Sequence, residues 1–172
     1  MAIGGIFKGL EAVIWVISDT HLTRSHILPE SFVHKVGRED IILHLGDMVS
    51  FEVMEYLQTL CQVEAVRGNC DMPDVRRGLP LKKIIELGGK KFGLIHGQGG
   101  QSQTLQMVKE EFAGKVDVAL FGHTHIPYLK RDNGTLYFNP GSLRDGREGT
   151  NSFGILNLDD EPWGEIIEIP NH

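Results

Sequence analysis

Cysteine is scarce in this 172-residue sequence, which contains only Cys61 and Cys70. Two cysteines cannot build a disulfide framework, and this favours a reducing compartment, so we expect a cytoplasmic protein. No apolar run approaches the roughly 20 residues that a membrane span requires, so we expect no membrane partner. Residues 1–11 also lack the apolar core and cleavage site of a signal peptide, and we interpret them as a short N-terminal extension.

A surplus of positive charge is missing as well. The 17 Lys and Arg residues are outnumbered by 23 Asp and Glu residues, which gives a formal net charge of -6. A general nucleic-acid binder usually presents a basic face, so we expect no dedicated nucleic-acid surface. Phosphate chemistry stays compatible with this charge, because bound cations reverse the local field. The sequence leaves open whether the chain forms a homo-oligomer.

Internal repeats, low-complexity segments and linkers are not found either. We therefore expect residues 1–172 to form a single domain, long enough to bury about two-thirds of the surface of its unfolded chain. The hydrophobic content of 41% and the charged content of 23% are ordinary for a globular protein.

The first half of the chain alternates short apolar runs with helical patterns. Continuous apolar runs at 12–18 and 40–45 predict strands that are buried on both faces, and 63–66 predicts a third strand. Between them, 29–36 is a candidate helix, and Ser50 can cap a second helix over 51–60.

The second half is richer in hairpin signals. Gly-Gly and Asn-Gly turns predict two hairpins, 102–112 has helical spacing, and 116–121 is the next apolar strand. The alternating segments 152–158 and 164–169 predict two further strands that pair antiparallel. The whole pattern predicts a layered α/β fold with mixed sheets.

Side chains able to bind metal follow several of the predicted strands, and the carboxyl ends of strands are where α/β folds gather their sites. They are Asp19, His21, Asp47, Asn69, His96, His123 and His125. Along an extended segment, alternate side chains point the same way, so Asp19 with His21, and His123 with His125, should each present two ligands to one cavity.

Imidazole and carboxylate ligands together suit zinc, manganese and iron. Seven ligands are too many for one tetrahedral ion, but they suit two ions that share a bridging carboxylate, as in two-metal phosphoester hydrolysis. Each motif alone has a structural explanation, since Gly-Asp and Gly-Asn are common turns and His96 would fit in a core. Their occurrence in order, each closing a strand, favours the metal site.

The ordered motifs DTH, GD, GNCD, HG and GHTH resemble the signature of the calcineurin-like metallophosphoesterases. The resemblance covers about the whole chain. The short length, GNCD and NPGS make it look most like the small bacterial and archaeal phosphodiesterase branch, which also resembles the phosphoesterase-fold subunit of the eukaryotic retromer. The resemblance implies a four-layer αββα sandwich with two mixed β-sheets.

The resemblance also implies a ligand assignment and an activity. One divalent ion would be bound by Asp19, His21, Asp47 and His125, and the second by Asp47, Asn69, His96 and His123. Manganese is our first expectation, with zinc, nickel, iron or magnesium as alternatives. The implied enzyme hydrolyses a small phosphodiester by attack of a metal-bridging hydroxide. The alternative is a catalytically weak scaffold that acts through protein contacts, although a retired site tends to lose ligands and all seven positions are filled.

Other residues receive supporting roles. The Asn69 amide can donate to a phosphate oxygen, and Asp71 is expected to orient a ligand histidine rather than to bind metal. Arg24 and Arg147, together with Arg144, are candidates for substrate binding because a guanidinium suits phosphate geometry. A solvated surface arginine explains them equally well.

Cys70 occupies the position at which many family members carry a histidine that acts as general acid. A thiol is a weak donor, so Cys70 would be a poor acid. As a nucleophile it would be unnecessary, and as a supporting or occasional metal ligand it is plausible. We favour loss of the acid, with the proton supplied by water or His123, or with a leaving group that departs unprotonated.

Overall fold

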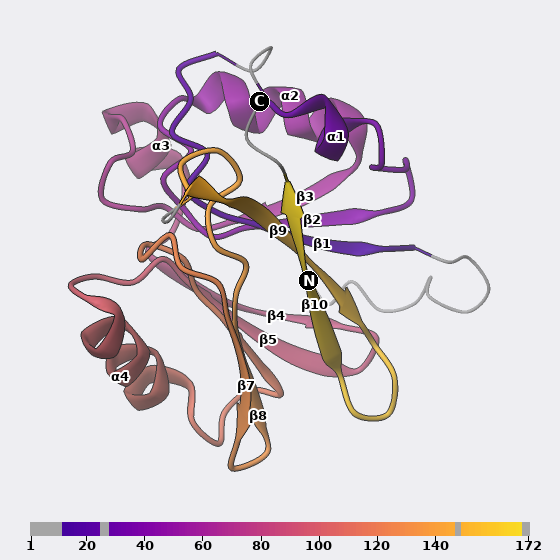
Figure 1. Cartoon of the computed structure of the whole chain (residues 1–172), viewed down its shortest axis with the longest axis vertical. Coiled ribbons are helices and arrows are strands. Elements are labelled where there is room, and N and C mark those ends of the chain that lie inside the picture. The colour runs from indigo at the N-terminus through magenta and orange to yellow at the C-terminus, as the bar shows by residue number, and fades with distance from the viewer. Residues whose placement is uncertain (1–11, 25–27, 147–148, 170–172) are drawn as a thin grey trace.

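The structure is a computed structural model that describes residues 12–24, 28–146 and 149–169. Two five-stranded sheets lie face to face, and helices cover their outer sides (Figure 1). The extension at 1–11 and the candidate substrate residue Arg147 lie outside the described residues. No described helix is long and apolar enough to cross a membrane.

The first sheet has the strand order β10-β9-β1-β2-β3. The strands β1, β2 and β3 run parallel to one another, with β3 at the edge of the sheet, whereas β9 is antiparallel to both β1 and β10. The bounds are β1 Ile14–Ile17, β2 Ile41–His44, β3 Gln62–Ala65, β9 Asn151–Asn157 and β10 Trp163–Ile169. The parallel strands β1 and β2 are the continuous apolar runs of the sequence, and both are buried along their whole length.

The second sheet has the strand order β4-β5-β6-β8-β7. Two antiparallel hairpins, β4–β5 and β7–β8, flank β6, which is parallel to both β5 and β8. The bounds are β4 Lys82–Leu87, β5 Lys90–Ile95, β6 Val118–Leu120, β7 Tyr128–Asp132 and β8 Thr135–Asn139. The two sheets are therefore both mixed, as the hairpin and strand signals predicted.

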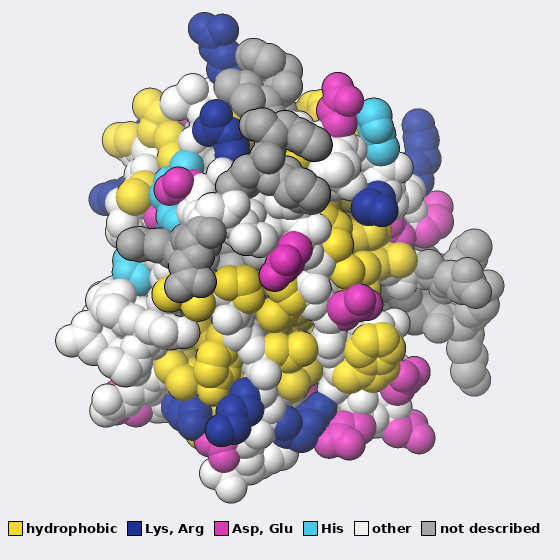
Figure 2. Space-filling model, viewed as in Figure 1, with side chains coloured by type: hydrophobic (Ala, Val, Ile, Leu, Met, Phe, Trp, Pro, Cys, Tyr) yellow, Lys and Arg dark blue, Asp and Glu magenta, His cyan; other side chains and the backbone are white. Residues whose placement is uncertain are grey.

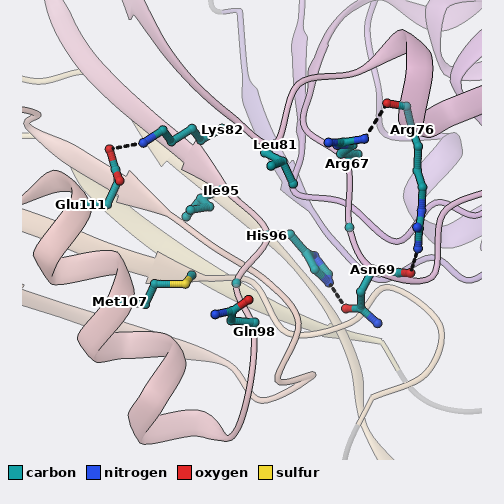
Figure 3. Close-up of a pocket in the computed structure, with 12 residues that line it drawn as sticks. Arg67, Asn69, Arg76, Leu81, Lys82, Ile95, His96, Gln98, Met107 and Glu111 are labelled. Atoms are coloured by element: carbon teal, nitrogen blue, oxygen red, sulfur yellow. Dashed lines mark hydrogen bonds and ion pairs between the residues drawn. The ribbon is translucent and has the colours of Figure 1, made fainter.

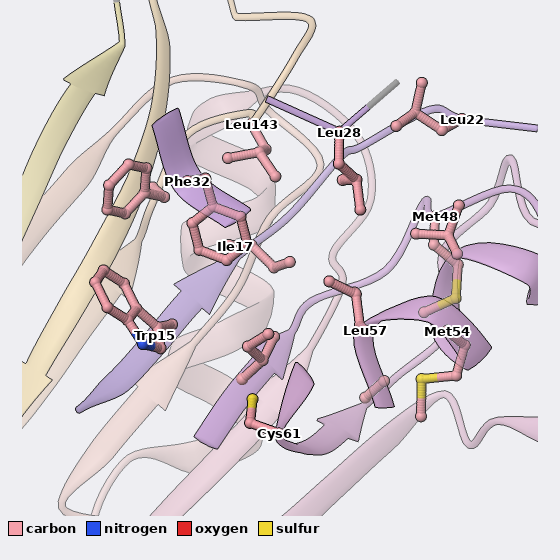
Figure 4. Close-up of a cluster of buried hydrophobic side chains, with 14 of the residues drawn as sticks. Trp15, Ile17, Leu22, Leu28, Phe32, Met48, Met54, Leu57, Cys61 and Leu143 are labelled. Atoms are coloured by element: carbon pink, nitrogen blue, oxygen red, sulfur yellow. The ribbon is translucent and has the colours of Figure 1, made fainter. Parts of the chain in front are cut away.

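Three buried apolar clusters separate the four layers. Trp15 and Ile17 of β1 pack with Leu57 of α2 (Phe51–Leu60) and Phe32 of α1 (Glu30–Val33) on the outer side of the first sheet (Figure 4). Side chains of both sheets fill the space between them. Residues of α4 (Gln101–Phe112) pack against the outer side of the second sheet. The expected four-layer αββα sandwich is thus confirmed.

Two helices differ from the expectations. The helix expected at 29–36 is a single turn, Glu30–Val33, and α3 (Pro73–Gly78) was not expected at all. Pro73 stands at the first position of α3, where its missing N–H is no loss. The helix is only six residues long, so it offers too little periodicity to stand out in the sequence.

The core between the sheets should dominate stability. Leu43 is fully buried there, and we expect Leu43→Ala to lower the free energy of unfolding by about 2–5 kcal/mol through lost burial and a residual cavity. Leu81 is 62% exposed, so the same truncation there should cost less than about 0.5 kcal/mol. Urea unfolding of the two variants measures both values, and equal losses would contradict this account of the core.

Candidate metal centre

The seven candidate ligands lie on loops that follow strands of both sheets. These loops are tied to one another by backbone hydrogen bonds: the Asp19 N–H donates to the Gly46 carbonyl at 3.0 Å, and the Gly122 N–H donates to the His96 carbonyl at 2.9 Å. The loop after β1 is thereby joined to the loop after β2, and the loop after β6 to the end of β5. Figure 2 shows histidine side chains at the molecular surface on the left of the view, and another at the upper right.

The ligands are not presented by extended backbone, so the expected alternation is wrong. Five of the seven have a positive φ, in the left-handed region that Asp and His tolerate better than most residues. They are Asp19 (53°), His21 (47°), Asp47 (55°), His123 (70°) and His125 (57°). Each such conformation costs of order 1–3 kcal/mol and clusters at functional sites. The side chains converge because the backbone turns sharply beside them.

Asp47 lies at the junction of two ligand groups. Its Oδ1 accepts a hydrogen bond from the Cys70 backbone N–H at 2.7 Å, which fixes the carboxylate. Its Oδ2 faces His21 Nε2 at 3.8 Å on one side and His96 Nε2 at 3.2 Å on the other. One carboxylate oxygen is therefore shared between the two groups.

The first group contains Asp19, His21, Asp47 and His125. His125 Nε2 lies 3.1 Å from Asp19 Oδ1 and 3.1 Å from His21 Nε2, and His21 Nε2 lies 3.7 Å from Asp19 Oδ1. The second group contains Asp47, Asn69, His96 and His123. Asn69 Oδ1 lies 3.2 Å from His96 Nε2 and 3.0 Å from His123 Nδ1. The structure brings together the two sets that the resemblance implied.

Backbone carbonyls determine which ring nitrogen carries the proton in two of the histidines. His96 Nδ1 donates to the Leu45 carbonyl at 2.7 Å, and His125 Nδ1 donates to the Asp145 carbonyl at 2.6 Å. In a neutral ring the other nitrogen, Nε2, then carries a lone pair that faces a carboxylate oxygen. Lone pairs that face one another require a cation or an added proton between them. A backbone carbonyl on the far ring nitrogen is also the usual support of a metal-binding histidine.

Asp19 provides a second test of fit to a metal. Its Oδ2 accepts from the Ser18 hydroxyl at 2.5 Å and from the His123 backbone N–H at 2.9 Å. Its Oδ1 is buried and has no well-formed hydrogen bond among the described residues. That orphaned oxygen is the one turned toward the imidazole nitrogens. The residues therefore fit a bound divalent cation.

The electrostatics of the metal-free site reflect the same arrangement. Burial opposes ionisation of Asp19, but His125 and His21 outweigh it and hold the pKa of the carboxyl well below its usual range. Burial likewise opposes the charged form of His96, yet the Asp47 carboxylate raises the pKa of that ring. The nearby Asp19 carboxylate raises the pKa of His125 despite partial burial.

Asp71 supports the backbone rather than a histidine ring. Its carboxylate accepts hydrogen bonds from the backbone N–H groups of Gly68 at 2.6 Å, Val49 at 2.7 Å and Asp47 at 3.3 Å. Within the described part of the chain, none of its hydrogen bonds goes to one of the candidate ligand histidines. Asp71 thus binds the loop of Asp47 to the loop of Asn69, which differs from the role we expected.

The NPGS segment supports the site, although we gave it no role beyond its resemblance to the family. The buried Asn139 amide donates to the Gly122 carbonyl at 2.9 Å and to the Thr124 hydroxyl at 3.1 Å. The Ser142 hydroxyl donates to the Asp19 carbonyl at 2.7 Å. These bonds hold the turns of His123 and Asp19, and they give the buried polar side chains of this segment their partners.

One arginine beside the site, Arg76, was not among the candidates that we named. Arg24 and Arg144 are exposed, and among the described residues no hydrogen bond or ion pair joins Arg24 to a candidate ligand. Instead, Arg76 of α3 donates to the backbone carbonyls of Asn69 and Asp71. The unexpected helix places this guanidinium, so the sequence alone gave no reason to choose it.

Cys70 faces the first ligand group. Its Sγ lies within 4.8 Å of ligand atoms of His21 and Asp47, and the Asn69 amide donates to it at 3.2 Å. Partial burial and the Asp47 carboxylate raise the pKa of the thiol to about 11. Without metal, the side chain is therefore a neutral thiol.

A family model for the calcineurin-like phosphoesterase superfamily domain matches residues 13–161. The chain belongs to this superfamily. A probable metallophosphoesterase of Methanocaldococcus jannaschii is 35% identical over 162 residues, which are 91% of this chain and 81% of that protein. A phosphodiesterase of the same organism is 26% identical over 90% of this chain and 98% of its own length.

A solved structure extends the comparison. Wild-type Vps29 of Entamoeba histolytica complexed with zinc is 26% identical, with a TM-score of 0.71 over 91% of this chain and 98% of its own. The superfamily thus includes proteins named for phosphodiester hydrolysis and a structure that contains zinc. Both are properties of those relatives.

The network around Asp71 gives a prediction about metal affinity. Asp71→Ala leaves three backbone N–H groups without their acceptor, so we expect stability to fall by about 1–3 kcal/mol. Because the loop of Asp47 loosens, Mn²⁺ affinity measured by calorimetry should fall roughly 10- to 100-fold. Asp74→Ala, on the exposed surface of α3, is the matched control and should leave the affinity unchanged. Unaltered affinity in Asp71→Ala would refute the role.

Proposed function

We propose that this chain is a single-domain, dinuclear-metal-dependent phosphodiesterase that acts on small phosphodiesters. The observation that carries the proposal is the sharing of Asp47 Oδ2 between two groups of ligands, at 3.8 Å from His21 Nε2 and 3.2 Å from His96 Nε2. Manganese is the proposed ion, because the donor set is imidazole, carboxylate and amide oxygen without a required thiolate. Family membership supports phosphoester hydrolysis as the reaction class.

Two bound ions supply a water of lowered pKa and neutralise phosphate oxygens as negative charge develops. The chain's own residues position this chemistry. Ser18 and the His123 backbone fix the Asp19 carboxylate, and the Cys70 backbone fixes that of Asp47. The exposed Asn69 side chain turns its Oδ1 toward His96 and His123 and its amide hydrogens toward Cys70, where a phosphate oxygen can accept them.

The second candidate is a scaffold with weak catalysis, and the similarity to Vps29 favours it. The complete set of ligand positions argues for catalysis, because a protein that works only through contacts has no need to retain left-handed backbone at five of them. Measuring hydrolysis by the metal-loaded protein distinguishes the enzyme from the scaffold.

Hydrolysis of phosphomonoesters, phosphodiesters and cyclic nucleotides with Mn²⁺, Zn²⁺, Ni²⁺ and Mg²⁺ tests the proposal. We expect phosphodiester hydrolysis, strongest with Mn²⁺, and its loss to background in Asp47→Ala because both ligand groups lose a member. Asp74→Ala controls for removal of a carboxylate and should keep full activity. A folded, metal-loaded protein that is inactive on every ester would support the scaffold instead.

The role of Cys70 gives a separate prediction. Since a thiol is a weak proton donor, Cys70→Ala should change kcat on aryl phosphodiesters only modestly. Cys70→His should accelerate esters with poor leaving groups more than aryl esters, because it restores a proton donor. A leaving-group series measures this as a change in slope. An effect that is uniform across the series, or inactivity of Cys70→Ala with metals bound, would contradict loss of the acid.

A further inference from the structure

A pocket of about 530 Å³ opens directly beside the second ligand group, and Asn69 and His96 belong to its lining (Figure 3). Its size lies in the range of small-molecule sites. The pocket extends from these two ligands between β5 and α4, so it leads away from the metals along the second sheet. None of the roles assigned above uses this space.

The apolar part of the lining consists of Leu81, Ile95 and Met107. Figure 3 shows these side chains on the side of the pocket beyond His96. Leu81 is 62% exposed, and neither Ile95 nor Met107 is fully buried. Ile95 also packs in part against the apolar cluster beneath α4, and all three side chains leave apolar surface open around one hollow. A flat organic group that binds against these side chains would bury its apolar surface away from water.

The polar part of the lining carries donors on one side. The Arg67 guanidinium donates from Nη1 to the Arg76 carbonyl at 2.7 Å, which fixes its plane, while its Nε is buried without a hydrogen-bond partner among the described residues. Arg76 is held by the carbonyls of Asn69 and Asp71. At the other end, Lys82 pairs with Glu111 at 2.7 Å and so contributes little net charge. The two arginines leave the pocket cationic.

We propose that this pocket binds one organic substituent of the phosphoester, and that it selects an aromatic ring bearing hydrogen-bond acceptors or negative charge. The inference rests on the proposed function, because the metals must hold the phosphorus group at Asn69 and His96. The ring lies against Leu81, Ile95 and Met107, and its acceptor atom receives a hydrogen bond from Arg67. These residues determine substrate specificity, whereas the ligand groups determine the reaction.

Phosphonates test the pocket without any reaction, because each carries one organic substituent on a metal-binding group. In the Mn²⁺-loaded protein, calorimetry should give a Kd for 2-naphthylphosphonate roughly 10-fold below that for methylphosphonate. Leu81→Ala and Met107→Ala should each reduce this ratio about 3- to 5-fold. Leu129→Ala, on β7 and 39% exposed, is the matched control and should leave the ratio unchanged. Equal affinity for the two phosphonates in the wild type overturns the proposal.

The hydrogen bond from Arg67 is tested with a second pair of phosphonates. A 6-carboxy group on the naphthyl ring should strengthen binding to the wild type, and Arg67→Gln should remove that gain while binding of the unsubstituted ring is kept. A purely structural role of Arg67 would weaken both compounds equally, and that result rules out the hydrogen bond to substrate. Arg77→Gln, on the exposed face of α3, serves as the control.

The binding experiment tests the pocket and the hydrolysis experiment tests the proposed enzyme, so either proposal can fail without the other. Selective binding of the aromatic phosphonate by a protein that hydrolyses no ester would reject the proposed enzyme and retain the pocket. Hydrolysis of aryl and alkyl diesters, with no preference between phosphonates and no effect of Leu81→Ala, would retain the enzyme and reject the pocket.

Discussion

The arrangement of this structure depends on the electrostatic problem of holding two carboxylates among four imidazole rings. Asp19 and Asp47 are both buried, and each has one oxygen anchored by hydrogen bonds and one turned toward ring nitrogens. Such a concentration of lone pairs is unfavourable unless positive charge occupies the centre. Cations relieve this cost, so the energy invested in folding the site becomes affinity for metal.

The surrounding residues keep the site from relaxing. Asp71 holds two ligand loops through their backbone, and Asn139 and Ser142 hold two others from a segment far along the chain. Gly68 shows how tight the assembly is, because a Cβ there would lie 2.1 Å from Asp47 Oδ1. The polar network also explains how buried polar side chains coexist with the apolar clusters between the layers, because Asp71, Asn139 and Ser142 each bond to backbone groups.

Sequence patterns were sufficient where a local signal coincided with the final environment. The runs at β1 and β2 are apolar on both faces because one face meets helices and the other meets the second sheet, and Ser50 caps α2 as expected. The ligand motifs stood out by their order. The left-handed turns, the partners of Asp71 and the position of Arg76 could not be predicted, because they arise from contacts between segments distant in sequence. Six residues of α3 were too few to carry a pattern.

The bond from His96 to the Leu45 carbonyl has a mechanical consequence. His96 follows β5 of the second sheet, whereas Leu45 follows β2 of the first, so the 2.7 Å bond crosses from one sheet to the other. The His123 N–H on Asp19 crosses in the same way. The edge that carries the candidate ligands therefore also links the two sheets of the sandwich. Ions bound along this edge would crosslink the two sheets. Local opening of the edge would release metal before the apolar cores between the layers unfold.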